Sequence, residues 1–185
     1  MTSCNQILRQ WATVALSIGL VAGVLWMPAV VRASTVILME LDALVSESDS
    51  IVQGVIEGVE SRWEGDYVFT YATVRIDDPL KGDRSRTLTI RQVGGRVGEL
   101  EVRVAGMPRF ESGMSLILFL TDSGNGTFHV TGMNQGSYVV NQDYAISNIT
   151  GVDLVNPKSG VVDQTSSVTR VGVEAFKSRI RGLVQ

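Results

Sequence analysis

Short runs of alternating apolar and polar residues, separated by glycine-rich turns, recur through residues 50–140. In Thr87–Val93, for example, Leu88 and Ile90 fall on one face and polar side chains on the other. A period of two is typical of half-buried antiparallel strands. Several short strands at this spacing favour a barrel or a sandwich. We therefore predict a mainly β fold, a small closed or partly open antiparallel β-barrel.

Two further patterns refine this prediction. Met114–Leu120 is apolar on both faces, which predicts a central strand. Ser50–Ser61 and Tyr67–Asp77 flank a turn signal and predict a long hairpin. Gly54 and Gly58 interrupt the first of these strands, and glycine inside a strand indicates a bulge or a tight bend.

Helical spacing appears near both ends of the part that follows residue 33. Leu41, Leu44 and Val45 predict a short helix over residues 40–47. Residues 170–184 predict a C-terminal amphipathic helix that covers an open end or face of the sheet. Residues 143–167 are rich in Asn, Gly, Ser and Thr, and we predict an irregular arm there.

The first 33 residues have the pattern of a secretory signal peptide. A polar start with one arginine precedes an almost wholly apolar run, Trp11–Val31. Small or modest residues, Val31 and Ala33, then occupy the −3 and −1 positions of a cleavage site. We predict cleavage near Ala33–Ser34 and a single exported domain over residues 34–185. The alternative is an uncleaved membrane anchor, because about 20 apolar residues can span a bilayer. The pattern does not separate periplasm from medium.

Charge and cysteine content narrow the function classes. The chain has a formal net charge of −3, and removal of Arg9 and Arg32 with the first 33 residues leaves −5. An acidic domain is poorly suited to nucleic acid, which is bound mainly through its phosphates by Lys and Arg. The single cysteine, Cys4, precedes the apolar run, so the predicted mature domain has no disulfide.

The order of the predicted strands resembles that of a known group of domains. The matching segments are Asp49–Val55, Val74–Ile76 leading to Leu80-Lys81-Gly82, Phe110–Gly113 before Leu116–Leu120, and Gly136-Ser137-Tyr138. Together they resemble uncharacterised exported bacterial domains whose layout is similar to the netrin-like domain of the tissue inhibitors of metalloproteases. The resemblance implies an OB-like barrel with flanking helices and a protein partner, with an exported protease among the candidates. Those inhibitors place an N-terminal cysteine on the protease zinc. The predicted mature residue here is Ser34, so this mechanism does not carry over.

No set of catalytic or metal-binding residues is evident. His129 is the only histidine, and one histidine cannot build a two-histidine zinc site. We interpret it as a sheet-surface side chain. The acids Asp77, Asp78 and Asp83 do not have the spacing of a calcium loop, and we interpret them as solvated turn residues. Residues 94–98 contain three glycines without a phosphate-loop ending. We predict no cofactor and no metal.

The most suggestive feature is a row of aromatic side chains. Tyr67, Phe69 and Tyr71 share one face of a predicted strand whose other face is apolar. If these rings lie outward, they form the kind of exposed aromatic cluster that marks binding surfaces. The alternative is that a bulge, the C-terminal helix or the arm covers them. With nearby arginines as a hydrogen-bonding rim, the candidate binding residues are Trp63, Tyr67, Phe69, Tyr71, Arg91, Arg96 and Arg109.

We therefore expect a non-enzymatic exported domain that binds a protein or a glycan. A structural subunit of a cell-surface or extracellular assembly, docked through edge strands or the C-terminal helix, is the alternative. A hydrolase of unrecognised type is the third hypothesis. Contact with a membrane is expected only if the N-terminal segment stays uncleaved, and the oligomeric state is open.

Overall fold

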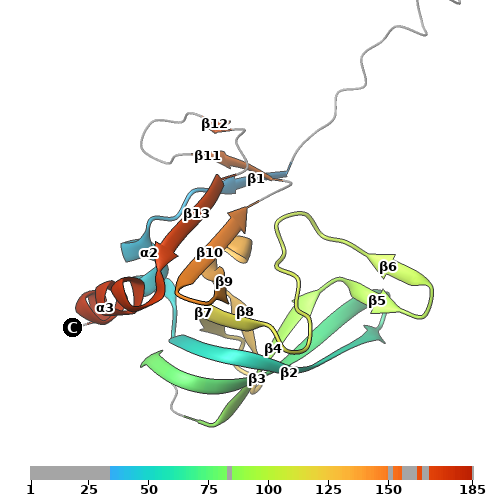
Figure 1. Cartoon of the computed structure of the whole chain (residues 1–185). Coiled ribbons are helices and arrows are strands. Elements are labelled where there is room, and N and C mark those ends of the chain that lie inside the picture. The colour runs from blue at the N-terminus through green and yellow to red at the C-terminus, as the bar shows by residue number, and fades with distance from the viewer. Residues whose placement is uncertain (1–33, 83–84, 150–151, 156–161, 164–166, 185) are drawn as a thin grey trace, which may run out of the picture. The chain divides into compact units, whose positions relative to one another are not determined.

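An eight-stranded sheet organises the domain (Figure 1). The computed structural model describes residues 34–82, 85–149, 152–155, 162–163 and 167–184. In sheet order the strands are β13 (Ser167–Gly172), β10 (Tyr144–Ile149), β9 (Ser137–Asn141), β7 (Ser115–Asp122), β2 (Ser50–Glu64), β3 (Tyr67–Lys81), β4 (Thr87–Val93) and β8 (Phe128–Val130). The predicted mainly β fold is confirmed, whereas the predicted signal peptide lies outside the described residues.

Five of these strands are hydrogen-bonded in a ring. β2 pairs with β3, β3 with β4, β4 with β8, β8 with β7, and β7 again with β2. The pairing of β4 with β8 is parallel and the other four are antiparallel. Strands β9, β10 and β13 extend the sheet beyond the ring from β7.

Strand β7 separates two hydrophobic cores, as its apolar pattern on both faces predicts. Ile117 and Phe119 point into one core, and Leu116, Leu118 and Leu120 into the other. All five side chains are buried. The second core lies inside the ring, where it also takes up side chains of β2, β3, β4 and β8.

Two helices cover the first core. The helix α2 (Leu41–Glu47) buries Leu44 and Val45, close to its predicted bounds. The helix α3 (Val173–Val184) buries Val173, Phe176 and Ile180. No helix among the described residues has the length and apolar character needed to cross a membrane.

The hairpin of β2 and β3 is longer than the sequence suggests. Each strand has 15 residues, and Gly65 and Asp66 alone form the turn between them. The register shifts near Gly54 and Gly58, at the two glycines expected to mark bends. A Cβ at Gly54 would lie 2.2 Å from the carbonyl oxygen of Arg75, so the close approach of β3 requires glycine there. We call the part of this hairpin between the last bulge and the turn, residues 58–73, the ribbon.

The segment Leu80-Lys81-Gly82 contributes to the family resemblance. Its side chains hold the end of β3 against α2. Leu80 is buried in the core under the helices. The ammonium of Lys81 donates to the carbonyl oxygens of Val45 and Ser48 at 2.7 and 2.6 Å. A helix leaves its last carbonyls without intrahelical donors, and Lys81 satisfies them at the end of α2. The segment therefore has a structural role.

Two small sheets complete the fold. One joins β1 (Ser34–Ile37), β11 (Val152–Val155) and β12 (Val162–Asp163). The other is the hairpin of β5 (Gly95–Val97) and β6 (Leu100–Val102), in which Arg96 pairs with Glu101. The glycine-rich residues 94–98, which lack a phosphate-loop ending, thus contribute the strand β5 to this hairpin.

The prediction for the C-terminal third also differs from the structure. Much of residues 143–167, expected to be an irregular arm, is β structure, and β10 lies within the main sheet. Its buried residues include Ala145 and Ser147, which are too small or too polar to signal a strand. Arg170 lies in β13, so the last helix begins at Val173 and not at residue 170.

Candidate functional site

The aromatic row of Tyr67, Phe69 and Tyr71 on β3 points outward, which is the first of the two alternatives left open by the sequence. Along β3 the side chains at 68, 70, 72 and 74 are buried, while those of Phe69 and Tyr71 are partly exposed. Tyr67, next to the turn of the ribbon, is 66% exposed. No described helix covers these rings.

The outward face nevertheless satisfies its own polar groups. The Glu64 carboxylate accepts hydrogen bonds from the Tyr71 hydroxyl, from Arg91 Nη2 at 2.7 Å and from Arg62 Nε at 3.3 Å. Arg91 Nε also donates to the Tyr71 oxygen at 2.9 Å. The bond from Tyr71, followed by that from Arg91, lowers the pKa of Glu64 to about 2. This network holds neighbouring strands together.

Two arginines cover the aromatic rings on the same face. The guanidinium of Arg91 lies 3.6 Å from the centre of the Phe69 ring, and that of Arg62 lies 4.0 Å from the centre of the Tyr71 ring. These cation–π contacts occupy the faces that a ligand would use. A ligand on this surface would have to displace contacts already made, so we assign Phe69, Tyr71 and Arg91 a structural role.

Trp63 does not belong to the aromatic row. The register pairs Trp63 with Val68, so its side chain lies on the opposite face of the ribbon from Tyr67. It is 51% exposed. The two-residue turn at Gly65-Asp66 sets this register by pairing Glu64 with Tyr67, so Trp63 does not share a face with the aromatic row.

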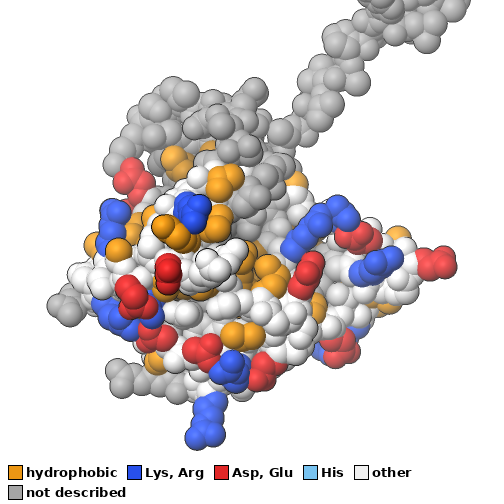
Figure 2. Space-filling model, in the orientation of Figure 1, with side chains coloured by type: hydrophobic (Ala, Val, Ile, Leu, Met, Phe, Trp, Pro, Cys, Tyr) orange, Lys and Arg blue, Asp and Glu red, His pale blue; other side chains and the backbone are white. Residues whose placement is uncertain are grey.

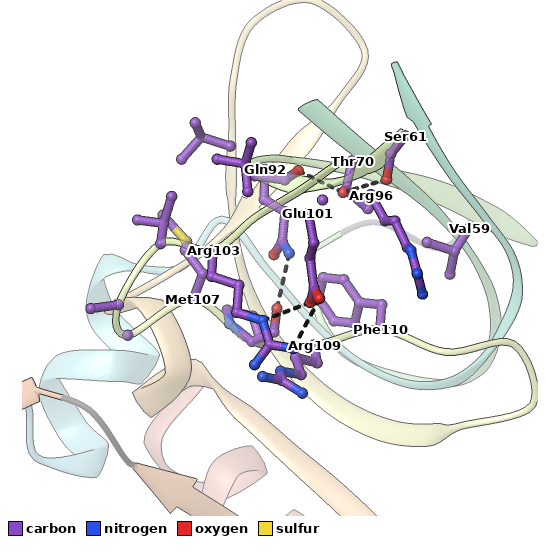
Figure 3. Close-up of a pocket in the computed structure, with 18 of the residues that line it drawn as sticks. Val59, Ser61, Thr70, Gln92, Arg96, Glu101, Arg103, Met107, Arg109 and Phe110 are labelled. Atoms are coloured by element: carbon purple, nitrogen blue, oxygen red, sulfur yellow. Dashed lines mark hydrogen bonds and ion pairs between the residues drawn. The ribbon is translucent and has the colours of Figure 1, made fainter. Parts of the chain in front are cut away.

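A hollow lies on that opposite face of the ribbon. It has a volume of about 660 Å³ and is bounded by β2, β3, the end of β4, the β5–β6 hairpin and residues 103–111 (Figure 3). Val59 and Ser61 of β2 and Thr70 of β3 contribute to its wall, followed further along the chain by Arg96 and Arg109. Two of the seven candidate residues thus meet here, away from the aromatic row.

A chain of hydroxyl groups forms one wall of the hollow. Thr70 Oγ1 donates to the carbonyl oxygen of Gly94 at 2.7 Å, and the hydroxyls of Thr70 and Ser61 are 2.9 Å apart. A hydroxyl carries one hydrogen. Since Thr70 gives its hydrogen to Gly94, Ser61 must donate to Thr70, and the free lone pairs of Ser61 Oγ are acceptors only.

Gly95 brings the β5–β6 hairpin close to this wall. Its φ is +134°, and a Cβ there would lie 2.1 Å from Thr70 Oγ1 and 2.5 Å from Ser61 Oγ. Any side chain would therefore push the hairpin off the ribbon. Glycine at this position fixes the width of the hollow.

Charged side chains from the hairpin and the loop after it surround the hollow. Figure 2 shows basic and acidic groups together over the β5–β6 end of the molecule. Both oxygens of Glu101 accept from Arg103, at 2.7 and 2.9 Å. This bond, with the nearby charges of Arg109 and Arg96, lowers the pKa of Glu101. Within the described part of the chain, Arg96 and Arg109 form no hydrogen bond or ion pair.

A smaller hollow of about 420 Å³ contains the single histidine. Its lining includes Phe69, Arg91, Met107 and His129. His129 is exposed on β8, with its Nδ1 3.1 Å from Ser123 Oγ. A catalytic base needs a group that orients it, and no carboxylate is bonded to His129 among the described residues. The interpretation of His129 as a sheet-surface side chain agrees with this position.

Asp77 and Asp78, interpreted from the sequence as turn residues, lie instead within β3 and have charged partners. Asp78, on β3, accepts from Lys177 at 3.0 Å and from Arg181 at 2.8 and 2.9 Å, which ties α3 to the sheet. Asp77 pairs with Arg75. Asp83 lies outside the described residues. No cluster of three or more His, Cys, Asp or Glu side chains suited to a metal occurs in the described ranges.

Comparison with models of known protein families and with curated proteins finds no match to this chain. The resemblance to netrin-like domains therefore stays a prediction. Sequence reasoning missed Ser61 and Thr70 as parts of the hollow. A signal was present, because these hydroxyls fall on the apolar face of their strands and oppose each other in the register.

Proposed function

We propose that this chain is an exported, non-enzymatic binding domain that recognises a segment of a protein partner in the hollow beside the ribbon. The observation that carries this proposal is the pair of arginines, Arg96 and Arg109, which line a 660 Å³ hollow without hydrogen-bond or ion-pair partners among the described residues. Ligand sites of folded proteins occupy about 300–1,000 Å³ and combine apolar walls with a few polar groups.

An OB-like architecture is part of the proposal. The ring places the third and fifth of its strands in the sequence, β4 and β8, side by side and parallel. It closes through the first and fourth, β2 and β7. This connection is that of a five-stranded Greek-key ring, and OB-type domains bind chain-like ligands on the surface of such a ring. Export is supported by the signal-peptide pattern of residues 1–33.

A protein ligand fits the surroundings of the hollow better than a glycan. Val59 is 40% exposed on its wall, and Trp63 lies two residues beyond Ser61 on the same face of β2. Exposed Trp and Arg beside apolar side chains are typical of the residues that dominate protein interfaces. Phe110 is the only aromatic ring among the lining residues, and it is buried in the core. The lining itself therefore offers no exposed ring for a sugar, and Trp63, beside the lining, is the one described ring on this face on which a sugar could stack.

An assembly subunit remains the second candidate because of the other end of the sheet. Among the described strands, β13 has a partner on one side only, and Val168 on it is largely exposed. An unpaired strand edge can accept a strand from another chain. The expected docking through α3 is less well supported, because its apolar face packs against the domain's own core.

Affinity capture with two matched variants separates these functions. The protein and its Val59→Arg and Val168→Arg variants would be immobilised and exposed to the exported proteins and glycans of the source organism, with mass spectrometry as the readout. We expect a protein partner that Val168→Arg retains and Val59→Arg loses, because the new arginine fills the hollow. Loss through Val168→Arg alone would support assembly. A partner retained equally by both variants would contradict a role for the hollow.

A further inference from the structure

We infer that the hollow selects an acidic polypeptide segment, whose carboxylate lies between Arg96 and Arg109 and whose backbone N–H donates to Ser61. This inference rests on the proposed binding function and adds the chemistry of the ligand. It begins with the balance of charge around Glu101.

The only acid that lies opposite Arg96 in the hairpin is already bonded elsewhere. Arg96 faces Glu101 across β5 and β6, yet Glu101 gives one oxygen to Arg103 Nε and the other to Arg103 Nη2. Glu101 thus neutralises Arg103 in a two-point contact, the strongest geometry for such a pair. The guanidinium groups of Arg96 and Arg109 keep their donors unused among the described residues.

The position of these two arginines makes a carboxylate a suitable ligand. Both arginines line the same hollow. Each guanidinium has five N–H donors in one plane, an arrangement that matches the two oxygens of a carboxylate. The domain as a whole is acidic, with a formal charge of −5 for residues 34–185 once Arg9 and Arg32 are excluded from the total of −3. The hollow is lined by three arginines and by two glutamates, Glu101 and Glu111, so its lining has a formal charge of +1 within an acidic domain. An acidic partner is therefore repelled by most of the surface and attracted to this site, which gives specificity and a faster encounter.

The hydroxyl wall indicates which further group the ligand carries. Ser61 Oγ presents acceptors only, because its hydrogen goes to Thr70. A ligand group that reaches Ser61 must therefore donate, as a backbone N–H does. A segment with an acidic side chain and free backbone N–H groups supplies both requirements. A simple anion supplies only the first.

The test uses defined probes and the protein produced from the whole 185-residue chain. Fluorescence anisotropy would measure binding of a labelled ten-residue peptide of alternating Glu and Ala, its Gln counterpart, and a labelled oligogalacturonate of ten sugars. We expect the Gln peptide to bind at least about tenfold more weakly, since charged hydrogen bonds are stronger than neutral ones. Added salt weakens binding of the Glu peptide, because it screens exposed charges.

Three variants locate the effect. Arg96→Ala with Arg109→Ala should lower affinity for the Glu peptide by about tenfold or more. Arg179→Ala, which removes one positive charge on the exposed side of α3, away from the hollow, should leave it unchanged. Ser61→Ala should weaken the Glu and Gln peptides by the same factor, about two- to tenfold, because Ser61 recognises the backbone.

Several results would overturn the inference. These are equal binding of the Glu and Gln peptides, an Arg179→Ala effect as large as that of the double variant, no effect of Ser61→Ala, or arginine-dependent binding of oligogalacturonate alone. The last would mean an acidic glycan. If Val59→Arg abolishes capture of a natural partner while the Glu peptide fails to bind, the proposed function stands and the acidic ligand does not.

Discussion

Substitution of Phe176 by alanine tests whether α3 belongs to the core or is a docking surface. The Phe176 side chain is 7% exposed, and its ring centre lies 4.7 Å from that of Tyr138 and 6.2 Å from that of Phe119. A buried Phe→Ala change costs about 3–5 kcal/mol of unfolding free energy. Each aromatic pair adds about 0.5–1.5 kcal/mol beyond buried area, so we expect the upper half of that range.

Leu183→Ala is the matched control, because Leu183 lies on the same helix and is 44% exposed. Exposed substitutions usually change the free energy of unfolding by about 0.5 kcal/mol or less. Urea unfolding followed by far-UV circular dichroism would measure both variants, with the slope checked for constancy. A loss below about 1 kcal/mol for Phe176→Ala, or an equal loss for Leu183→Ala, would refute the packing argument and favour α3 as a free surface.

Two further predictions concern the ribbon. Glu64→Gln should be less stable than the wild type at pH 6, and the difference should vanish in acid. The pKa of Glu64 is lowered from 4.5 to about 2, so its contribution is complete above about pH 4.5 and is lost as pH falls through about 2; a difference that stays constant from pH 6 to pH 2 would contradict this. Gly95→Ala should lower the free energy of unfolding by about 1–3 kcal/mol, the usual cost of a strained backbone position. Gly98→Ala, at a positive φ with open space around it, is the control for φ alone, and urea unfolding that shows equal losses for both would contradict the close approach of Gly95 to Ser61.

The strands with clear alternation could be predicted from the sequence, and those with polar interiors could not. In β4, the alternation of Leu88 and Ile90 with polar residues predicts one buried face. In β7, five apolar residues in succession predict that both faces of the strand are buried. In β10 the buried face carries Ala145, Ser147 and Ile149. Burial there depends on the neighbouring strands β9 and β13, which a local pattern does not reveal.

The period of two places Tyr67, Phe69 and Tyr71 on one face of β3 but leaves open whether that face is covered. The structure leaves Tyr67 exposed and Phe69 and Tyr71 partly exposed. The engagement of those rings by Arg62 and Arg91 depends on cross-strand register. The turn at Gly65-Asp66 sets the pairing of β2 with β3, and β4 brings Arg91 opposite Tyr71. The hollow itself arises because a distant hairpin folds over the ribbon, and no pattern within either segment encodes that contact.

The position of β7 between two cores has a consequence for how the domain unfolds. Phe119 and Leu118 are neighbours in sequence, yet they anchor different halves of the interior. Disruption of the helices on one side exposes the same strand that closes the ring on the other. Because both halves share this strand, we expect the domain to unfold cooperatively. We therefore expect damage to α3 to reach the hollow as well, although no residue of α3 lines it.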